Sequence, residues 1–317
     1  MKESDIKLIC LKKTKMKLKG KLKKIGHVFK QTFSEFINDN VLKLSAALSY
    51  YTIFSLPPLV IIVTSLCGIY YGPEAVRGEL YGQIQGFVGS KAALQIQEII
   101  KSVHITFHNT FATIIGVIVL IIGASGVFAE IQDSINYIWG IKAKPERGLI
   151  RFIINRLMSF FMIVAAGFLL LVGLLVNSIA DLLNKRIIPY HPPETMYLYH
   201  VFSFLLLYIL ITCLFVAIFK ALPDGKVSFR HSVVGASLTA IFFTGGKYLI
   251  STYLSSSGIG SVYGAAGSVI LVLAWVYYSA IILYFGAEFT KVYSKTYGKG
   301  IIPNGYTIVI AKHGSNL

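Results

Sequence analysis

The amino-acid sequence predicts an all-α, polytopic membrane protein with six transmembrane helices and both termini in the cytoplasm. Of its 317 residues, 55% are hydrophobic and only 14% are charged, whereas a soluble domain carries roughly 25% charged residues. The charges are confined to short stretches between long apolar runs. A helix needs about 20 apolar residues to cross a bilayer, and its backbone must be satisfied within the segment. These two features, with the basic loops described below, predict the fold class.

Residues 1–43 form a basic arm that holds twelve lysines against four acidic residues, which is +8 of the net charge of +16. Such an arm beside a first span is typical of a cytoplasmic anchor on anionic lipid. An RNA-binding tail is the less favoured alternative, so we expect lipid partners and no nucleic acid. Apolar residues recur in the arm at helical spacing, and they are Leu22, Ile25, Phe29, Phe33, Phe36 and Ile37. They predict an amphipathic helix that lies on the inner leaflet or packs against the cytoplasmic ends of the spans.

The transmembrane domain is predicted over residues 44–290. Its six apolar spans lie near 44–71, 111–129, 157–179, 201–219, 233–254 and 266–285. The loops after the second, fourth and sixth spans are basic, and the other loops are neutral or nearly so. Every loop therefore fits the positive-inside rule, which places both termini in the cytoplasm.

Two regions outside the spans also have predicted structure. The first outer loop, over 79–103, carries apolar residues that predict one or two amphipathic helices. Residues 291–317 form a cytoplasmic tail, in which 306–310 favour a strand.

The first span combines hydroxyl side chains with a proline break. Ser49 and Thr52 lie on one helical face with Ser45 and Ser55, just before Pro57 and Pro58. The prolines should kink or break the helix. A hydroxyl face beside a broken helix suits a polar cavity, but it also suits close helix packing, which is the favoured alternative by about two to one.

Lys247 lies within the fifth span, where hydrocarbon penalises a charge. Its long stem can snorkel to the outer surface. Equally, it can face a cavity and pair with Asp181 at the outer end of the third span.

Two carboxylates, Glu130 and Glu288, end the second and sixth spans at a similar depth, and Asp133 lies one turn after Glu130. A structural ion network is favoured over proton or cation handling, with Arg151, Arg156 or Lys43 as available cations. Tyr277 shares a face of the sixth span with Glu288, and a phenol at mid-membrane needs a polar partner. We expect this face to point into the bundle.

Soluble catalysis has little support in the sequence. The three cysteines, Cys10, Cys67 and Cys213, lack metal-like spacing, and His104 and His108 have no evident third ligand. No phosphate-binding loop or nucleophile elbow is present. We expect no metal, no cofactor and no enzymatic activity.

Three stretches resemble the YihY/BrkB family of bacterial inner-membrane proteins, once labelled ribonuclease BN. They are Leu44-Ser-Ala-Ala-Leu-Ser-Tyr-Tyr-Thr-Ile-Phe-Ser-Leu-Pro-Pro58, Gly123-Ala-Ser-Gly-Val-Phe-Ala-Glu-Ile-Gln-Asp133 with Trp139-Gly140, and Gly264-Ala-Ala-Gly-Ser268 with Trp275-Val-Tyr-Tyr278 and Tyr284-Phe-Gly-Ala-Glu288. The resemblance covers about residues 25–295. It implies a multi-pass protein of the bacterial inner membrane, with a role in envelope maintenance and in moving lipid-like molecules. The nuclease label looks like a misattribution, in line with the absence of a metal site in the sequence.

The leading hypothesis is a transporter-like protein that moves a lipid-like amphiphile or a small solute. The pathway or gating candidates are Ser49, Thr52, Pro57, Pro58, Glu130, Asp133, Asp181, Lys247, Tyr277 and Glu288. The alternative is a non-catalytic scaffold that recruits partners through the basic arm. Six helices can enclose a path alone or as a homo-oligomer, and both arrangements stay open.

Overall fold

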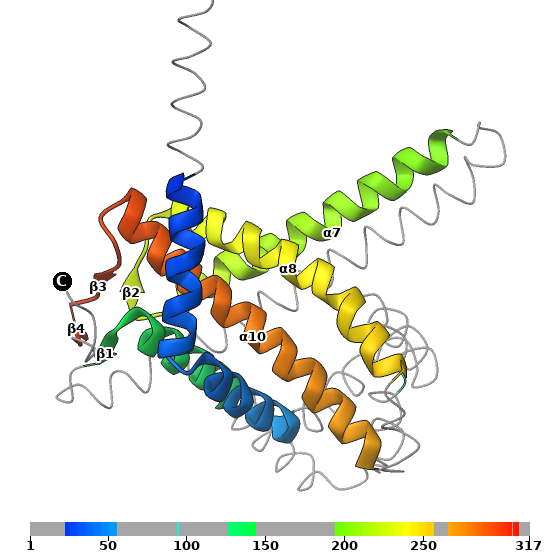
Figure 1. Ribbon diagram of the computed structural model, residues 1–317, viewed down its shortest axis with the longest axis horizontal. Helices are drawn as coiled ribbons and strands as arrows, with labels where there is room; N and C mark the ends of the chain where they lie inside the picture. Colours follow the sequence, from blue (N-terminus) through cyan, green and yellow to red (C-terminus); the bar gives the residue numbers. More distant parts are fainter. Residues whose placement is uncertain are drawn as a thin grey trace, which may run out of the picture.

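The computed structural model describes residues 23–55, 94, 126–143, 194–256, 266–305 and 307–310. Helices form most of this part (Figure 1). They span 23–38, 41–55, 126–139, α7 (Glu194–Ala221), α8 (Phe229–Ser256) and α10 (Ala266–Tyr297). Four short strands complete it, namely β1 (Ile141–Ala143), β2 (Gly225–Lys226), β3 (Ile302–Pro303) and β4 (Thr307–Val309).

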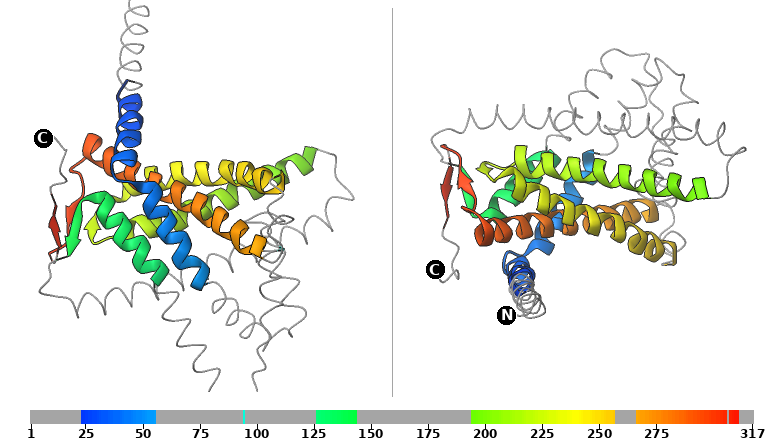
Figure 2. Two further views of the ribbon diagram at one scale, coloured as in Figure 1. Left: turned by 60° about the horizontal axis from the view of Figure 1, so that its bottom comes forward. Right: turned by 90° about the horizontal axis from the view of Figure 1, so that it is seen from above.

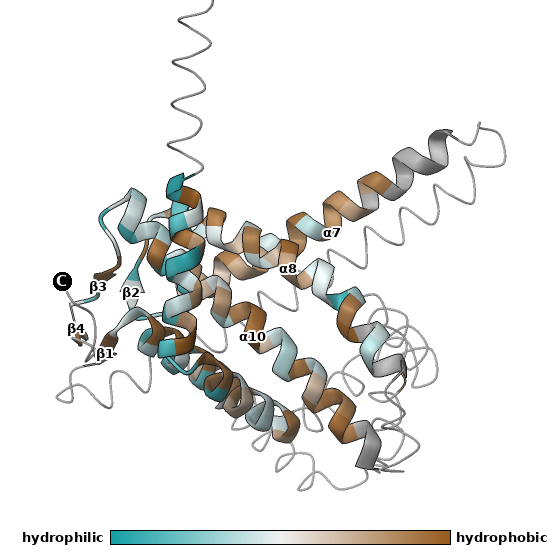
Figure 3. Cartoon of the chain, in the orientation of Figure 1, coloured by the Kyte–Doolittle hydropathy of each residue, from teal (hydrophilic) through white to brown (hydrophobic). Residues whose placement is uncertain are grey.

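Three helices in the described part of the chain are long and apolar enough to cross a membrane, over Phe204–Ala221, Phe229–Ile250 and Val269–Tyr297. They match the predicted spans 201–219, 233–254 and 266–285. α8 packs against both α7 and α10. The hydrophobic residues prevail along α7 and α10, whereas hydrophilic ones gather where helix 23–38 crosses the last turns of α10 (Figure 3).

The other predicted spans are described only in part or not at all. Helix 41–55 covers the start of the first span, and helix 126–139 extends past the predicted end of the second. The third span and the outer-loop helices lie outside the described residues, except for the single helical residue Leu94.

α8 and α10 approach each other closely because each presents a glycine to a threonine of the other. The Thr290 hydroxyl fills the space where a Cβ would lie on Gly235, and the Thr239 hydroxyl does the same at Gly286. Both hydroxyls donate to carbonyls of their own helix, Thr239 to Gly235 and Thr290 to Gly286, at 2.7 Å each. Small residues that let helix backbones approach are typical of interfaces in membrane bundles.

The predicted amphipathic helix of the arm is present over 23–38. It ends in a tight turn at Asn40, whose φ of 51° lies in the left-handed region that asparagine tolerates. The helix packs on α10 through ring contacts of Phe29 with Phe289 and of Phe36 with Phe285, at centroid distances of 5.3 and 5.8 Å. This packing agrees with the second of the two alternatives, although Phe33 on the outer side stays 60% exposed.

The strands collect at one end of the helices (Figure 2). β1 follows helix 126–139 and pairs antiparallel with β4, while β2, between α7 and α8, pairs antiparallel with β3. The strand expected over 306–310 is confirmed as β4. The end of helix 126–139, the end of α7, the start of α8 and the end of α10 therefore meet at one end, which we call the strand end.

The hydrophobic core of the described residues is centred near the strand end. Its fully buried side chains include Val41, Ile135, Ile138, Phe219, Leu222 and Tyr284. These residues come from helices 41–55 and 126–139, from α7 and its following loop, and from α10. The core thus joins helices that are far apart in the sequence, just inside the strand end.

Candidate functional site: a buried charged cluster

Lys291, near the end of α10, is almost fully buried, with 4% of its surface exposed. Its ammonium nitrogen lies 2.5 Å from Glu35 Oε2, 2.8 Å from Glu288 Oε2 and 3.4 Å from Asp39 Oδ2. It also donates to the backbone carbonyl of Ile138 at 2.8 Å. One cation therefore holds helices 23–38 and 126–139 against α10. We call Glu35, Asp39, Glu288 and Lys291 the charged cluster.

The charged cluster contains three carboxylates and a single described cation. Glu288 is completely buried, and the Asp39 side chain lies within hydrogen-bonding reach of it. Glu288 therefore has two partners, the Lys291 ammonium group and the Asp39 carboxyl group. Two facing carboxylates repel unless a proton or a cation lies between them. The cluster therefore has room for one more positive charge.

Glu35 lies at the more open side of the charged cluster. Burial opposes its charged form, but the nearby Lys291 charge and hydrogen bonds from Lys291 and Gln31 prevail, and the pKa of Glu35 falls below its usual value. Gln31 Nε2 donates to Glu35 Oε1 at 3.0 Å. Lys291 and Gln31 therefore favour the ionised form of Glu35.

A second buried acid, Asp224, lies in the loop between α7 and β2, and its surroundings differ. Its two carboxylate oxygens accept from Gln132 Nε2 at 3.1 Å and from Asn136 Nδ2 at 2.8 Å. Its backbone N–H donates to Asn136 Oδ1, and its carbonyl accepts from the Asn304 N–H. The Thr307 hydroxyl also donates to that carbonyl, at 3.3 Å. Asp224 therefore ties helix 126–139 to the α7–α8 loop and to the C-terminal strands.

A third polar group lies deeper along helix 126–139. The Ser134 hydroxyl donates to Glu130 Oε1 at 3.2 Å. Tyr284, one turn before Glu288, is fully buried, and its hydroxyl approaches Ser134 without full hydrogen-bond geometry. Glu130 and Glu288 thus lie on packed helices, with Tyr284 on the face of α10 that carries Glu288.

The predicted candidates fall into several different settings. Glu288 is in the charged cluster, Glu130 is half-buried and Asp133 is exposed. Tyr277 is half-buried on α10, and Lys247 is half-buried with its nitrogen 5.8 Å from the centroid of the Tyr248 ring. Asp181 lies outside the described residues, so its pairing with Lys247 stays a prediction.

The hydroxyl face of the first span is buried and bonds to its own helix. Ser49 donates to the Ala46 carbonyl and Thr52 to the Leu48 carbonyl, both at 2.8 Å. Ser45 and Ser55 bond in the same way. All four bonds lie within one helix, so the choice between close packing and a polar cavity stays a prediction. Pro57 and Pro58 lie outside the described residues.

Sequence reasoning missed Lys291 as the cation of Glu288. It proposed Arg151, Arg156 or Lys43, but Lys43 is exposed and the arginines lie outside the described residues. The i, i+3 spacing of Glu288 and Lys291 was the available signal, because such residues neighbour each other on a helix. Glu35 and Asp39 had no local signal, and neither had Asp224.

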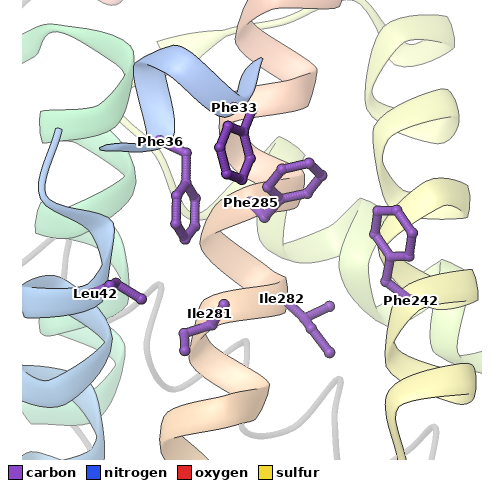
Figure 4. A pocket seen from close by; sticks show the side chains of 7 residues that line it. All are labelled: Phe33, Phe36, Leu42, Phe242, Ile281, Ile282 and Phe285. Carbon is purple, nitrogen blue, oxygen red and sulfur yellow. The ribbon is translucent and has the colours of Figure 1, made fainter. Parts of the chain in front are cut away.

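An apolar groove adjoins the charged cluster on the outside of helix 23–38 and α10 (Figure 4). Its volume is about 340 Å³. It is lined by Phe33, Phe36, Leu42, Phe242, Ile281, Ile282 and Phe285. Phe36 follows Glu35 in sequence, and Phe285 lies one turn before Glu288. The groove and the charged cluster are thus built from neighbouring turns of the same helices.

In the described part of the chain, no group of three or more His, Cys, Asp or Glu residues is arranged to hold a metal ion. The charged cluster is therefore built around an ammonium group.

Comparison with known proteins gives a family match. The family model described as "Virulence factor BrkB" matches residues 32–303. A UPF0761 membrane protein of Pseudomonas paraeruginosa is 28% identical over 258 residues, which cover 80% of this chain and 59% of that protein. A UPF0761 membrane protein of Saccharophagus degradans is 26% identical over 280 residues, 88% of this chain and 62% of that one. One of Vibrio vulnificus is 27% identical over 248 residues, 77% of this chain and 74% of that one.

The matched part spans about three fifths of the length of the Pseudomonas and Saccharophagus relatives. No solved structure matches the chain.

Proposed function

The chain belongs to the membrane-protein family described as "Virulence factor BrkB", and from this premise we propose that it moves a lipid-like amphiphile or a small solute across the bacterial inner membrane. In this proposal the protein crosses the membrane six times, and its strand end lies in the cytoplasm. The basic residues of the loops that meet at this end support the orientation, since positive loops stay on the cytoplasmic side. Envelope maintenance is the cellular role we propose for it.

The observation that carries the proposal is the charged cluster. Buried ionisable groups are costly, and clusters of them are candidates for functional sites. Here one lysine is shared by three carboxylates, and one of them, Glu288, is fully buried. A site that only joined helices would need one balanced ion pair, whereas this cluster holds three acids for one lysine next to an apolar groove. An amphiphile needs both kinds of surface.

A transport assay tests the proposal. The purified protein is reconstituted into liposomes that carry a fluorescent phospholipid in both leaflets, and the fraction quenched from outside is followed over time. We expect label from the inner leaflet to reach the outer leaflet, and to be quenched there, faster in protein-containing liposomes than in protein-free ones. Glu288→Gln should lose this effect, because it removes the buried acid while keeping its size. Asp224→Asn, at a buried acid whose two oxygens are both paired, is the matched control and should keep it per folded molecule.

The second candidate function is a scaffold, which the charge of the basic arm favours. Twelve lysines against four acids within 43 residues can recruit acidic partners as well as lipid. Deleting residues 1–20 separates the two functions, because the described helix 23–38 and the charged cluster stay in the chain. Loss of partner recruitment with unchanged lipid movement would assign the arm to scaffolding. Loss of neither would remove the scaffold as a candidate.

A further inference from the structure

The apolar groove beside the charged cluster is formed by four helices that converge on the outside of the bundle (Figure 4). Helix 23–38 provides two of the lining side chains, helix 41–55 one, α8 one and α10 three, and all seven are apolar. The groove opens outward, since Phe33, Leu42 and Phe242 are 60%, 51% and 39% exposed. Its volume of about 340 Å³ is within the roughly 300–1,000 Å³ of small-ligand sites. An open apolar groove in a membrane protein faces acyl chains, so its natural occupant is hydrocarbon.

Two exposed lysines lie close in the sequence to residues that line the groove. Lys30 is exposed one helical turn before Phe33, and Lys43 is exposed directly after Leu42. Neither lysine has an ion-pair partner among the residues that the structure describes. The acids on the same stretch, Glu35 and Asp39, are turned to Lys291. The apolar lining is therefore accompanied by two exposed cations on helices 23–38 and 41–55.

We propose that this groove binds one acyl chain of an anionic phospholipid, whose headgroup lies against Lys30 and Lys43. The apolar lining selects the chain, and the two lysines select a negative headgroup. Each lysine near a membrane surface contributes an affinity of roughly five-fold for anionic lipid. A zwitterionic phospholipid satisfies only the lining, so it binds the groove more weakly.

The inference deepens the proposed function, on which it rests for the amphiphile being a membrane lipid. The lipid chain would lie beside Phe36 and Phe285, one turn or less from Glu35 and Glu288 of the charged cluster. A lipid bound in the groove would therefore lie next to the charged cluster, which we propose takes part in moving it. Binding, however, requires no movement, so the two claims fail separately.

Native mass spectrometry of the full chain tests the inference. The protein is released from vesicles that contain equal amounts of phosphatidylglycerol and phosphatidylcholine, and the lipids retained are counted. We expect phosphatidylglycerol to be retained in preference, and the double change Lys30→Gln with Lys43→Gln to reduce that preference roughly five-fold per lysine. The same double change at the exposed Lys142 and Lys226 is the matched control and should leave the preference unaltered. An equal loss in both pairs would overturn the headgroup assignment.

The groove itself is tested by filling it. Leu42→Trp places a larger ring at the half-exposed mouth without disturbing a buried position, and Leu249→Trp makes the same change on an exposed face of α8 outside the groove. We expect Leu42→Trp to lower retention of both lipids several-fold and Leu249→Trp to change neither. Equal retention by the two variants would overturn the proposal.

A photo-reactive benzophenone amino acid at Phe33 identifies the occupant directly. An adduct with phospholipid supports the inference, whereas an adduct with another part of this chain or with a second copy overturns it. Lipid binding that persists without transport would contradict the proposed function alone. Transport that persists after lipid binding is lost would contradict the groove assignment alone.

Discussion

Two buried acids at the strand end, Asp224 and Glu288, have different surroundings, although Asp224 binds helix 126–139 directly and Glu288 is linked to it through Lys291. Asp224 accepts from two amide side chains, and its backbone groups are also paired. Glu288 faces Asp39 and shares Lys291 with two other carboxylates. A fully satisfied polar network rigidifies a fold, whereas an incompletely satisfied one is costly. Asp224 therefore ties elements together through paired groups, whereas Glu288 lies among three acids that share one lysine, and the proposed function rests on that difference.

Replacing Lys291 is expected to have the largest effect on stability. Lys291→Met leaves three acids without their shared cation, and breaking a buried ion pair costs about 3–5 kcal/mol. Helix 23–38 should detach, so thermal unfolding in detergent should shift to lower temperature and protease should cut earlier in the arm. Lys295→Met, on an exposed position one turn later, is the control. A Lys291→Met protein as stable as this control would show that the charged cluster does not hold helix 23–38.

Replacing Asp224 is expected to lower stability by a smaller amount and to leave lipid movement unchanged. Asp224→Ala leaves Gln132 and Asn136 without their acceptor, and an unsatisfied buried polar group costs about 1–3 kcal/mol. We expect a lower unfolding temperature, measured by the intrinsic fluorescence of Trp139 in helix 126–139 and of Trp275 in α10. Lipid movement per folded molecule should be unchanged. Loss of lipid movement in protein that remains folded would remove the distinction between the two acids.

Glu288→Gln should affect stability least among the buried changes. The glutamine amide keeps the size of the side chain and supplies a donor toward Asp39. The free energy of unfolding should therefore stay within about 1 kcal/mol of the wild type, or rise. A fall as large as that of Lys291→Met would mean that the ionised Glu288 is a structural partner of Lys291.

The smallest expected effect is the pH dependence contributed by Glu35. Lys291 holds the pKa of Glu35 below its usual value of 4.5 against the opposing effect of burial. The unfolded carboxyl therefore binds protons more readily, so the stabilisation is complete above pH 4.5 and is lost as pH falls through the lower folded pKa. The packing of helix 23–38 on α10 should therefore weaken over that acidic range. Proteolysis of the arm measures this packing. Glu35→Gln should lose this pH dependence. A Glu35→Gln protein whose proteolysis depends on pH as the wild type does would contradict the role of Glu35.

Much of the fold follows from hydropathy and charge alone. The three apolar helices α7, α8 and α10 and the amphipathic helix 23–38 were predicted from runs and spacing of apolar residues. The prediction ended the last span at residue 285, but α10 continues to Tyr297. An apolar run stops where charges begin, whereas a helix continues if other elements neutralise those charges, as Glu35 and Asp39 do for Lys291.

The candidate site was predictable only where its signal was local. Glu130 and Glu288 stood out because each ends an apolar run. The pairing of Lys291 with Asp39 joins residues 252 positions apart, and that of Asp224 with Asn136 joins residues 88 apart. Such contacts depend on how helices dock, which a single sequence does not encode in any local pattern. Asp224 in particular lies in a Pro-Asp-Gly turn, where an aspartate is ordinarily a surface residue.

The most direct test of the contrast compares lipid movement by Glu288→Gln and Asp224→Asn in liposomes that contain equal amounts of folded protein. Fluorescent phospholipid is followed from one leaflet to the other, alongside the unfolding temperature of each variant. We predict that Glu288→Gln stops lipid movement at near-normal stability, while Asp224→Asn moves lipid normally at reduced stability. Normal movement by Glu288→Gln, or wild-type protein that moves lipid no faster than empty liposomes, would contradict the functional role of the charged cluster.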